Sequence, residues 1–130
     1  MEGRIRLTQF TAEMPRGTVL AEGRARFSDG ILSYAEKEDN TVRHEVLFTP
    51  EEIVIRRFGE TVTEIILNTD SRGTGTVHTP YGLIEMETEL LRYETEQDKT
   101  TVEYRLMQGE QMVLQQTFVW EWKGTTDEQN

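Results

Sequence analysis

The sequence alternates between apolar and polar residues, and this period of two constrains the fold more than any other feature. Between residues 111 and 122, one parity is apolar at every position but one: Met112, Leu114, Phe118, Trp120 and Trp122. Successive side chains of a strand point to opposite faces, so this pattern predicts a long strand with one buried face. Residues 42–48, 83–93 and 99–107 repeat the alternation. We therefore expect an all-β protein.

Turn sequences rich in Gly, Pro, Asp and Asn separate these segments at short, even intervals. They divide the chain into ten predicted strands: 3–12, 17–27, 30–36, 41–48, 52–58, 61–68, 73–79, 82–94, 99–107 and 110–122. Connections this short join antiparallel neighbours. A meander with one apolar face either forms a sandwich or closes on itself. We expect a single up-and-down antiparallel β-barrel of about 8–10 strands, because closure removes the exposed edges.

Folding the last three strands about their turns tests this interpretation. It predicts four pairs of facing residues: Tyr104 with Leu114, Leu106 with Met112, Leu90 with Tyr104, and Glu89 with Arg105. The first three pairs are apolar and the fourth joins opposite charges. One parity is therefore inward in all three strands.

Length, charge and composition limit the number of domains, the possible cross-links and metal sites, and the kinds of partner that this protein can have. The 130 residues suit one domain. We expect the barrel over 1–123 and a polar, disordered tail over 124–130. The absence of cysteine excludes disulfides and cysteine-ligated zinc. A net charge of −10 argues against nucleic acid and anionic membranes as partners. No apolar segment is long enough to span a bilayer or act as a signal peptide, so a cytoplasmic location is expected.

The element Thr79-Pro80-Tyr81-Gly82, with the alternating strand Leu83–Leu91 after it, resembles the YwiB-like family. This is a bacterial domain-of-unknown-function family of small β-barrels, related in fold to the calycins, which include lipocalins and fatty-acid-binding proteins. The similarity continues through Val102–Leu106 and the last long strand, and upstream it includes Gly30–Tyr34. The resemblance implies a calycin-like barrel in a cytoplasmic bacterial protein. The family offers no established catalytic or binding residues to transfer.

At two places in the sequence, the alternation directs a charged or titratable side chain toward the inside of the barrel. His44 shares its parity with apolar neighbours, and we expect a hydrogen-bonded core histidine, with ligand contact as the alternative. Of Arg56 and Arg57, one must face the lumen, because neighbouring residues of a strand point to opposite faces. A buried guanidinium needs a partner. That partner is either a carboxylate such as Glu64 or an anionic ligand, as in fatty-acid-binding barrels.

Other polar or amphipathic side chains are candidates for the lumen or its rim. Thr88 and Gln116 interrupt apolar parities. Tyr104 and Trp120 add amphipathic aromatic surface, and Tyr81 is expected at the rim. In a packed core these polar atoms would bond to one another, whereas in a hollow barrel they would line a cavity.

The row Glu85, Glu87, Glu89 is expected to be a solvated outer face, balanced by Arg24, Arg26 and Arg105. No phosphate-binding loop, nucleophile elbow or zinc spacing occurs, so neither a metal nor a cofactor is expected.

Three functions are compatible with the sequence. The first is a non-enzymatic barrel that binds a small, partly apolar or anionic molecule in its lumen. The second is a protein-interaction module with a filled barrel, acting through its acidic outer surface or rim. The third and least favoured is an enzyme using His44 with an acidic residue. A lumen of about 300 Å³ or more favours cargo, and a filled lumen favours a surface function.

Overall fold

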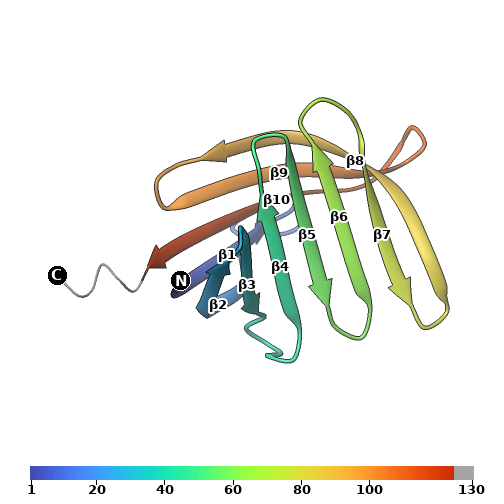
Figure 1. Cartoon of the computed structure of the whole chain (residues 1–130). Helices are drawn as coiled ribbons and strands as arrows, with labels where there is room; N and C mark the ends of the chain where they lie inside the picture. The colour runs from blue at the N-terminus through green and yellow to red at the C-terminus, as the bar shows by residue number, and fades with distance from the viewer. Residues whose placement is uncertain (125–130) are drawn as a thin grey trace.

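The computed structural model describes residues 1–124, which form ten β-strands (Figure 1). Each lies within two residues of the predicted bounds: β1 (Glu2–Phe10), β2 (Thr18–Ser28), β3 (Ile31–Ala35), β4 (Arg43–Phe48), β5 (Glu52–Phe58), β6 (Val62–Asn68), β7 (Gly73–Thr79), β8 (Gly82–Thr95), β9 (Lys99–Gln108) and β10 (Gln111–Gly124). The tail predicted over 124–130 falls outside the described residues, apart from Gly124 at the end of β10.

No helix in the described part of the chain is long and apolar enough to cross a membrane.

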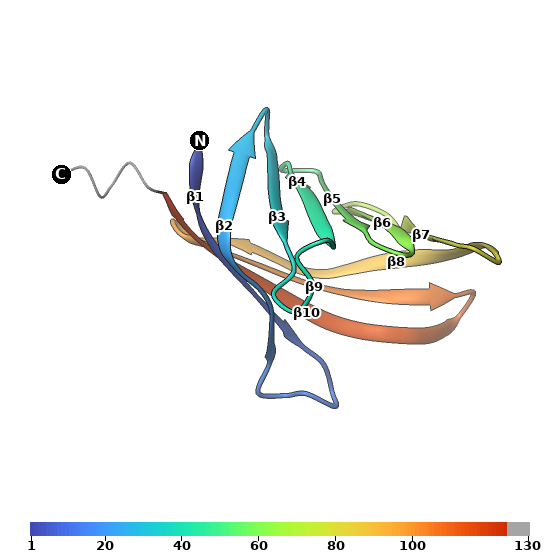
Figure 2. The ribbon, with the colours of Figure 1, turned by 90° about the horizontal axis from the view of Figure 1, so that it is seen from below.

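The strands form one closed antiparallel barrel, as the alternation predicted. Each strand pairs with its neighbours in sequence, and β1 pairs with β10 from Gly3↔Gly124 to Phe10↔Thr117 to close the sheet. Figures 1 and 2 show the chain passing around the barrel in order, with the N-terminus and the end of β10 on the same side. The architecture is all-β and is consistent with a calycin-like barrel.

The two ends of the barrel differ in the turns they carry. We call the end with the N-terminus and the β2–β3, β4–β5, β6–β7 and β8–β9 turns the terminal end. The other end carries the β1–β2, β3–β4, β5–β6, β7–β8 and β9–β10 connections, and we call it the loop end. Successive antiparallel strands run between these ends, so each inward side chain belongs to one end or to the middle.

The middle of the barrel is packed with side chains from all around the sheet. The residues with the least solvent exposure share the inward parity of their strands: Leu7, Tyr34, Val46, Ile53, Leu67, Thr88 and Val102. Their burial supplies the main stabilising free energy of the fold, because apolar surface leaves water.

The predicted register is correct for β8 with β9 and wrong for β9 with β10. Leu90 lies opposite Tyr104 and Glu89 opposite Arg105, as expected. Tyr104 lies opposite Gln116 instead of Leu114, and Leu106 lies opposite Leu114 instead of Met112. Two local features account for the difference. The turn places Gln111 opposite Gln108, which shifts the register by one residue, and a bulge between Met112 and Leu114 shifts every later pair by one more.

Candidate functional site

A chain of buried hydrogen bonds crosses the interior from β10 to β4. The Trp120 indole N–H donates to the Tyr34 hydroxyl over 2.7 Å, and that hydroxyl lies 3.3 Å from His44 Nδ1. The Tyr34 and His44 rings also stack, with centroids 5.0 Å apart. His44 is 3 % exposed and Trp120 is 2 % exposed. His44 is therefore a hydrogen-bonded core histidine, and Trp120 is fixed in orientation.

The chain continues from His44 to a carboxylate and a guanidinium at the loop end. His44 Nε2 lies 2.7 Å from Glu36 Oε2. Arg57 bonds both oxygens of the same carboxylate, at 2.7 and 3.3 Å. Arg57 pairs with His44 across β4 and β5, and so it is the arginine on the inward parity. Its partner is Glu36 and not Glu64, since Glu64 binds the outward Arg56 at 2.7 Å.

The electrostatics of this cluster favour a neutral histidine beside an ion pair. Burial lowers the pKa of His44 and outweighs the opposing effect of Glu36. Burial acts to raise the pKa of Glu36, but hydrogen bonds from Arg57 and His44 outweigh it and hold that pKa below its ordinary value. A neutral His44 with its proton on Nε2 donates to Glu36 and accepts from Tyr34, so both ring nitrogens are occupied.

Gln116 and Tyr104 form a second interior cluster with Gln9. The Gln116 amide donates to the Tyr104 hydroxyl, and its carbonyl oxygen accepts from the Gln9 side chain. Burial raises the pKa of Tyr104 to about 12, so its hydroxyl stays protonated. Thr88 is also buried, and its hydroxyl donates to the carbonyl of Ile66 over 2.6 Å. These polar groups bond to one another or to backbone, as a packed core requires.

Tyr81, the remaining predicted site residue, lies in the turn between β7 and β8 and is 98 % exposed. Within residues 1–124, every fully buried side-chain nitrogen or oxygen has a hydrogen-bond partner. The polar groups predicted to face the lumen are therefore paired inside the barrel and lie apart from Tyr81.

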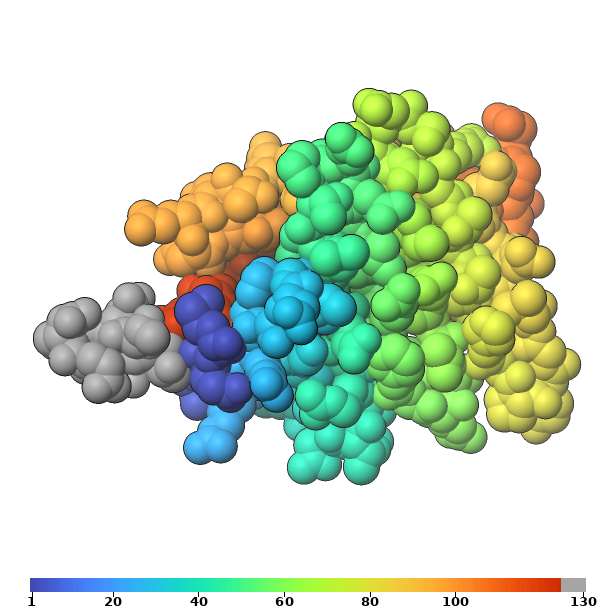
Figure 3. All heavy atoms as spheres, in the orientation of Figure 1, coloured from blue at the N-terminus to red at the C-terminus, as the bar shows by residue number. Residues whose placement is uncertain are grey.

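Open space lies at the terminal end, in a pocket of about 220 Å³ above the packed middle. We call it the aromatic pocket, lined by Met1, Ile5, Phe27, Leu32, Phe48, residues 95–100, Trp120 and Trp122. Figure 3 shows a hollow on this side, between the orange β8–β9 turn, the blue N-terminal strands and the red of β10. Of the predicted site residues, only Trp120 lines the aromatic pocket.

The walls of the aromatic pocket are held by edge-to-face ring contacts. Phe48 packs on Trp120 with centroids 5.2 Å apart and an interplanar angle of 82°. Phe27 packs on Trp122 at 6.3 Å and 64°. The N-terminal amine bonds the Phe27 carbonyl at 2.9 Å, which fixes the end of β2 beside β1. The pocket therefore presents preformed aromatic walls.

The polar rim of the aromatic pocket comes from the β8–β9 turn. Glu96, Asp98 and Lys99 all line it. Lys99 Nζ lies 3.8 Å from Glu96 Oε1. The Asp98 carbonyl accepts from the Trp122 backbone N–H over 2.9 Å, which ties the turn to β10. The pocket is thus bordered by two carboxylates and two ammonium groups: Lys99 lies close to Glu96, and the N-terminal ammonium of Met1 is bonded to the Phe27 carbonyl.

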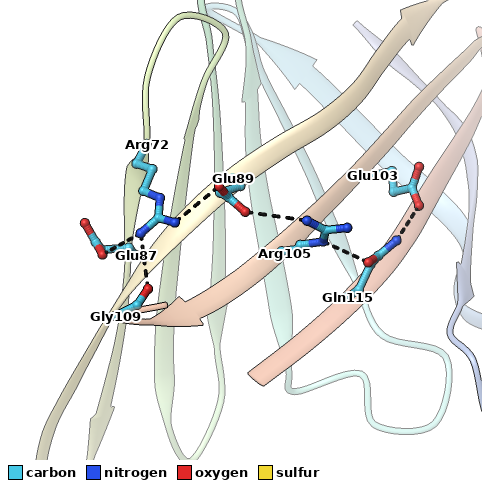
Figure 4. Close-up of polar contacts among 7 residues, drawn as sticks. All are labelled: Arg72, Glu87, Glu89, Glu103, Arg105, Gly109 and Gln115. Atoms are coloured by element: carbon cyan, nitrogen blue, oxygen red, sulfur yellow. Dashed lines mark hydrogen bonds and ion pairs between the residues drawn. The ribbon is translucent and has the colours of Figure 1, made fainter. Parts of the chain in front are cut away.

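The acidic row on β8 lies outside the barrel, as predicted, and its arginine partners agree with the prediction in part: Arg105 is observed, and Arg72 was not expected (Figure 4). Arg72 bonds Glu87 at 3.0 Å and Glu89 at 3.3 Å. Arg105 lies 3.8 Å from Glu89, as expected from the facing pair. Arg24 and Arg26, the other expected partners, lie on β2, where Arg26 is 3.8 Å from Glu2. The outer row is therefore a charge ladder across β8 and β9.

Sequence reasoning missed Glu36 and the aromatic residues Phe27 and Phe48. Glu36 was detectable, because it continues the inward parity of Leu32 and Tyr34. Phe27 and Phe48 end strands β2 and β4 at the same end of an antiparallel meander, which was the available signal.

Comparisons with known proteins place the chain in a family. The profile described as Domain of unknown function (DUF1934) matches residues 11–118. The crystal structure of the ywiB protein from Bacillus subtilis has the same fold, with a TM-score of 0.58 and 12% sequence identity. The similarity covers 95% of this chain and 89% of that chain. Among curated proteins, none matches the sequence. Because the profile matches most of the chain, the chain belongs to the family of DUF1934 domains, and its fold is the barrel expected of YwiB-like proteins.

Proposed function

We propose that this protein binds a small, largely apolar molecule in the aromatic pocket, at the terminal end of the barrel. The observation that carries the proposal is the position of Trp120 and Trp122, the two tryptophans of the chain, in the walls of one open pocket with Phe27 and Phe48. Apolar walls with few polar groups at the rim are typical of small-molecule sites. The packed middle of the barrel argues against a large cargo in the lumen.

The size and charge of the aromatic pocket define the class of ligand. A volume of about 220 Å³ lies below the roughly 300 Å³ expected of a lumen that holds cargo, so the pocket has room only for a molecule smaller than a drug. The carboxylates of Glu96 and Asp98 are matched by the ammonium groups of Lys99 and Met1, so the charge of the rim does not by itself select a charged ligand. The faces of tryptophan rings attract cations, and they therefore favour a neutral or cationic polar end over an anionic one. Arg57, the anion anchor considered from sequence, is bound to Glu36 and lies at the loop end.

A matched series of six-carbon probes tests the proposal. Hexanol, hexanoate and hexyltrimethylammonium share an apolar chain and differ in the charge of the head group. We expect saturable changes in tryptophan fluorescence with hexanol and hexyltrimethylammonium, and weaker binding of hexanoate. Since both tryptophans line the pocket, the signal reports this site directly. Fluorescence that does not change saturably with any of the three would contradict the proposal.

Two variants locate the binding. Phe27→Ala removes a half-exposed wall of the aromatic pocket, with little disturbance of the packed middle, and should weaken binding about tenfold or less, as expected for truncating a contact residue. Tyr81→Ala removes an exposed aromatic ring away from the pocket and should leave binding unchanged. Equal affinities in the two variants would place the ligand elsewhere.

A second candidate function is protein interaction, and the packed interior favours it. The barrel has its middle filled and its buried polar groups paired, so its remaining chemistry lies on the surface and at the rims. The outer carboxylates Glu87 and Glu89 are held by Arg72 and Arg105. This leaves the rim at the loop end as the better surface for a partner. No catalytic role is assigned, because both nitrogens of His44 are bonded and buried.

A further inference from the structure

One strand edge at the loop end has no neighbour. β1 pairs with β10 only as far as Phe10↔Thr117. Beyond that point the chain turns away from β10: backbone bonds join Thr11 and Met14 in both directions, at 3.4 and 3.1 Å. Residues Gln111–Gln116 of β10 therefore pair with β9 alone. Figure 2 shows the β1–β2 hairpin diverging from the β9–β10 hairpin.

A groove of about 550 Å³ runs along this edge. We call it the edge groove. Phe10–Glu13 line one side, Met112–Thr117 line the other, and Glu103 of β9 contributes to its wall. Both parities of β10 face it, as expected for a groove along a strand edge rather than over a sheet face.

The exposed edge lacks the side chains that usually prevent pairing. Residues 111–117 read Gln-Met-Val-Leu-Gln-Gln-Thr, with no charged residue and no proline. Met112 and Val113 are about half exposed, at 52% and 50%. Free edges in proteins are normally protected by charges, proline or bulges, and here the bulge near Val113 leaves Leu114–Gln116 in regular strand geometry. The edge can therefore accept another strand.

The shape and charge of the edge groove identify the occupant. The Phe10–Glu13 segment stands opposite the β10 edge, so the groove admits a single extended segment more readily than a second barrel. Its charged lining residues are both carboxylates, Glu13 and Glu103, in a chain with a net charge of −10. Complementary charge favours a cationic partner.

We propose that the edge groove binds an extended peptide segment bearing Lys or Arg, from a partner protein, as an added strand on β10. The inference rests on the second candidate function and is independent of the aromatic pocket. Main-chain hydrogen bonds to Leu114–Gln116, and to Gln111 and Met112 on the other side of the bulge, supply affinity, and alternate side chains of the peptide meet Glu13 and Glu103. Six residues of edge span about 20 Å, which matches a peptide of about six extended residues.

Two fluorescein-labelled octapeptides test whether the edge groove prefers a cationic peptide. One alternates Lys with Val, the other alternates Glu with Val, and both have capped ends. We expect saturable anisotropy with the Lys-Val peptide, weakened by added salt, and no measurable binding of the Glu-Val peptide. Backbone amide exchange followed by NMR on the same complex should show new protection within residues 111–116. The absence of protection there overturns the inference. Protection of another surface instead keeps an interaction role but rejects the edge groove, whereas no binding at all rejects both.

Charge variants provide the matched control. The double variant Glu13→Gln with Glu103→Gln should weaken the Lys-Val peptide about fivefold, the expected loss for two solvent-exposed ion pairs. The double variant Glu60→Gln with Glu85→Gln changes net charge equally at exposed positions outside the groove and should leave the affinity within about twofold. Equal weakening by the two double variants overturns the assignment of the cationic contacts.

Discussion

At the scale of single residues, His44 shows how a buried titratable group is accommodated. Its imidazole lies between the Tyr34 hydroxyl and the Glu36 carboxylate, and Arg57 balances that carboxylate. A neutral ring satisfies all these bonds, with Nε2–H donating and Nδ1 accepting. Burial accordingly lowers the pKa of His44.

This lowered pKa predicts a pH dependence of stability. The unfolded chain takes up a proton on His44 near its ordinary pKa of 6.5, and the folded chain resists doing so. The unfolded state then binds more protons, so the free energy of unfolding falls as pH drops below 6.5, by up to about 1.4 kcal/mol per pH unit. Urea unfolding of the wild type at pH 7 and pH 5 measures this fall, and His44→Phe should reduce it.

The same variant also loses stability at pH 7. His44→Phe leaves the Tyr34 hydroxyl without its acceptor, which costs about 1–3 kcal/mol. The control is His78→Gln, which changes an exposed histidine and should retain the pH dependence of the wild type. A pH dependence unaltered in His44→Phe, with intact or raised stability, would show that the ring merely fills the core.

At the scale of elements, the close approach of β7 to β6 and β8 explains why the polar residue Thr88 stands among the apolar inward residues of β8. A Cβ placed on Gly73 would clash with the carbonyl oxygen of Ile66 and would lie 2.7 Å from Thr88 Oγ1. Thr88 donates to that same carbonyl, so a small residue on β7 and a hydroxyl on β8 are both needed there. Close packing and this hydrogen bond therefore explain the interruption at Thr88.

Substituting alanine at two nearby glycines tests this contact. Gly73→Ala forces backbone to shift and should cost about 1–3 kcal/mol or more in the free energy of unfolding. Gly75→Ala places its Cβ 3.3 Å from Ile65 Cδ1 and 3.4 Å from Leu106 Cδ2, the movable ends of side chains, and should cost less. Chemical denaturation of both variants makes the comparison, and equal losses would contradict the proposed tightness of β7 against β6.

Sequence periodicity predicts the elements well because the alternation is local. The inward parity of His44, Thr88 and Gln116 could be predicted, since each lies in a strand with apolar neighbours two residues away. The register of β9 with β10 could not be predicted, because it depends on both the exact position of the turn and the bulge near Val113, and the bulge depends on how the whole β9–β10 hairpin curves. The partner of Arg57 was also missed, although Glu36 lies in the predicted strand 30–36 and continues its inward parity, because Glu64 on the adjacent strand is the nearer carboxylate in the sequence.

At the scale of the whole molecule, closure of the barrel separates a packed middle from two different ends. The terminal end gathers Phe27, Phe48, Trp120 and Trp122 around the aromatic pocket. The loop end holds the unpaired edge of β10. The sequence offers one signal for the terminal end, because Phe27 and Phe48 lie near the ends of strands that finish there. The meeting of these residues with Trp120 and Trp122, and the free edge of β10, depend on the closure and tilt of the strands and could not be predicted. The alternation predicts the barrel but not which end stays open.

The most direct test of ligand binding at the terminal end is the NMR signal of the two indole N–H groups during titration with hexyltrimethylammonium. The chain contains two tryptophans, and both line the aromatic pocket. We predict saturable shifts of both indole signals, with the side-chain amide signal of Gln116, in the separate cluster with Tyr104, unchanged. Indole signals that stay in place at saturating probe, or shifts confined to Gln116 and its neighbours, would contradict binding in the aromatic pocket.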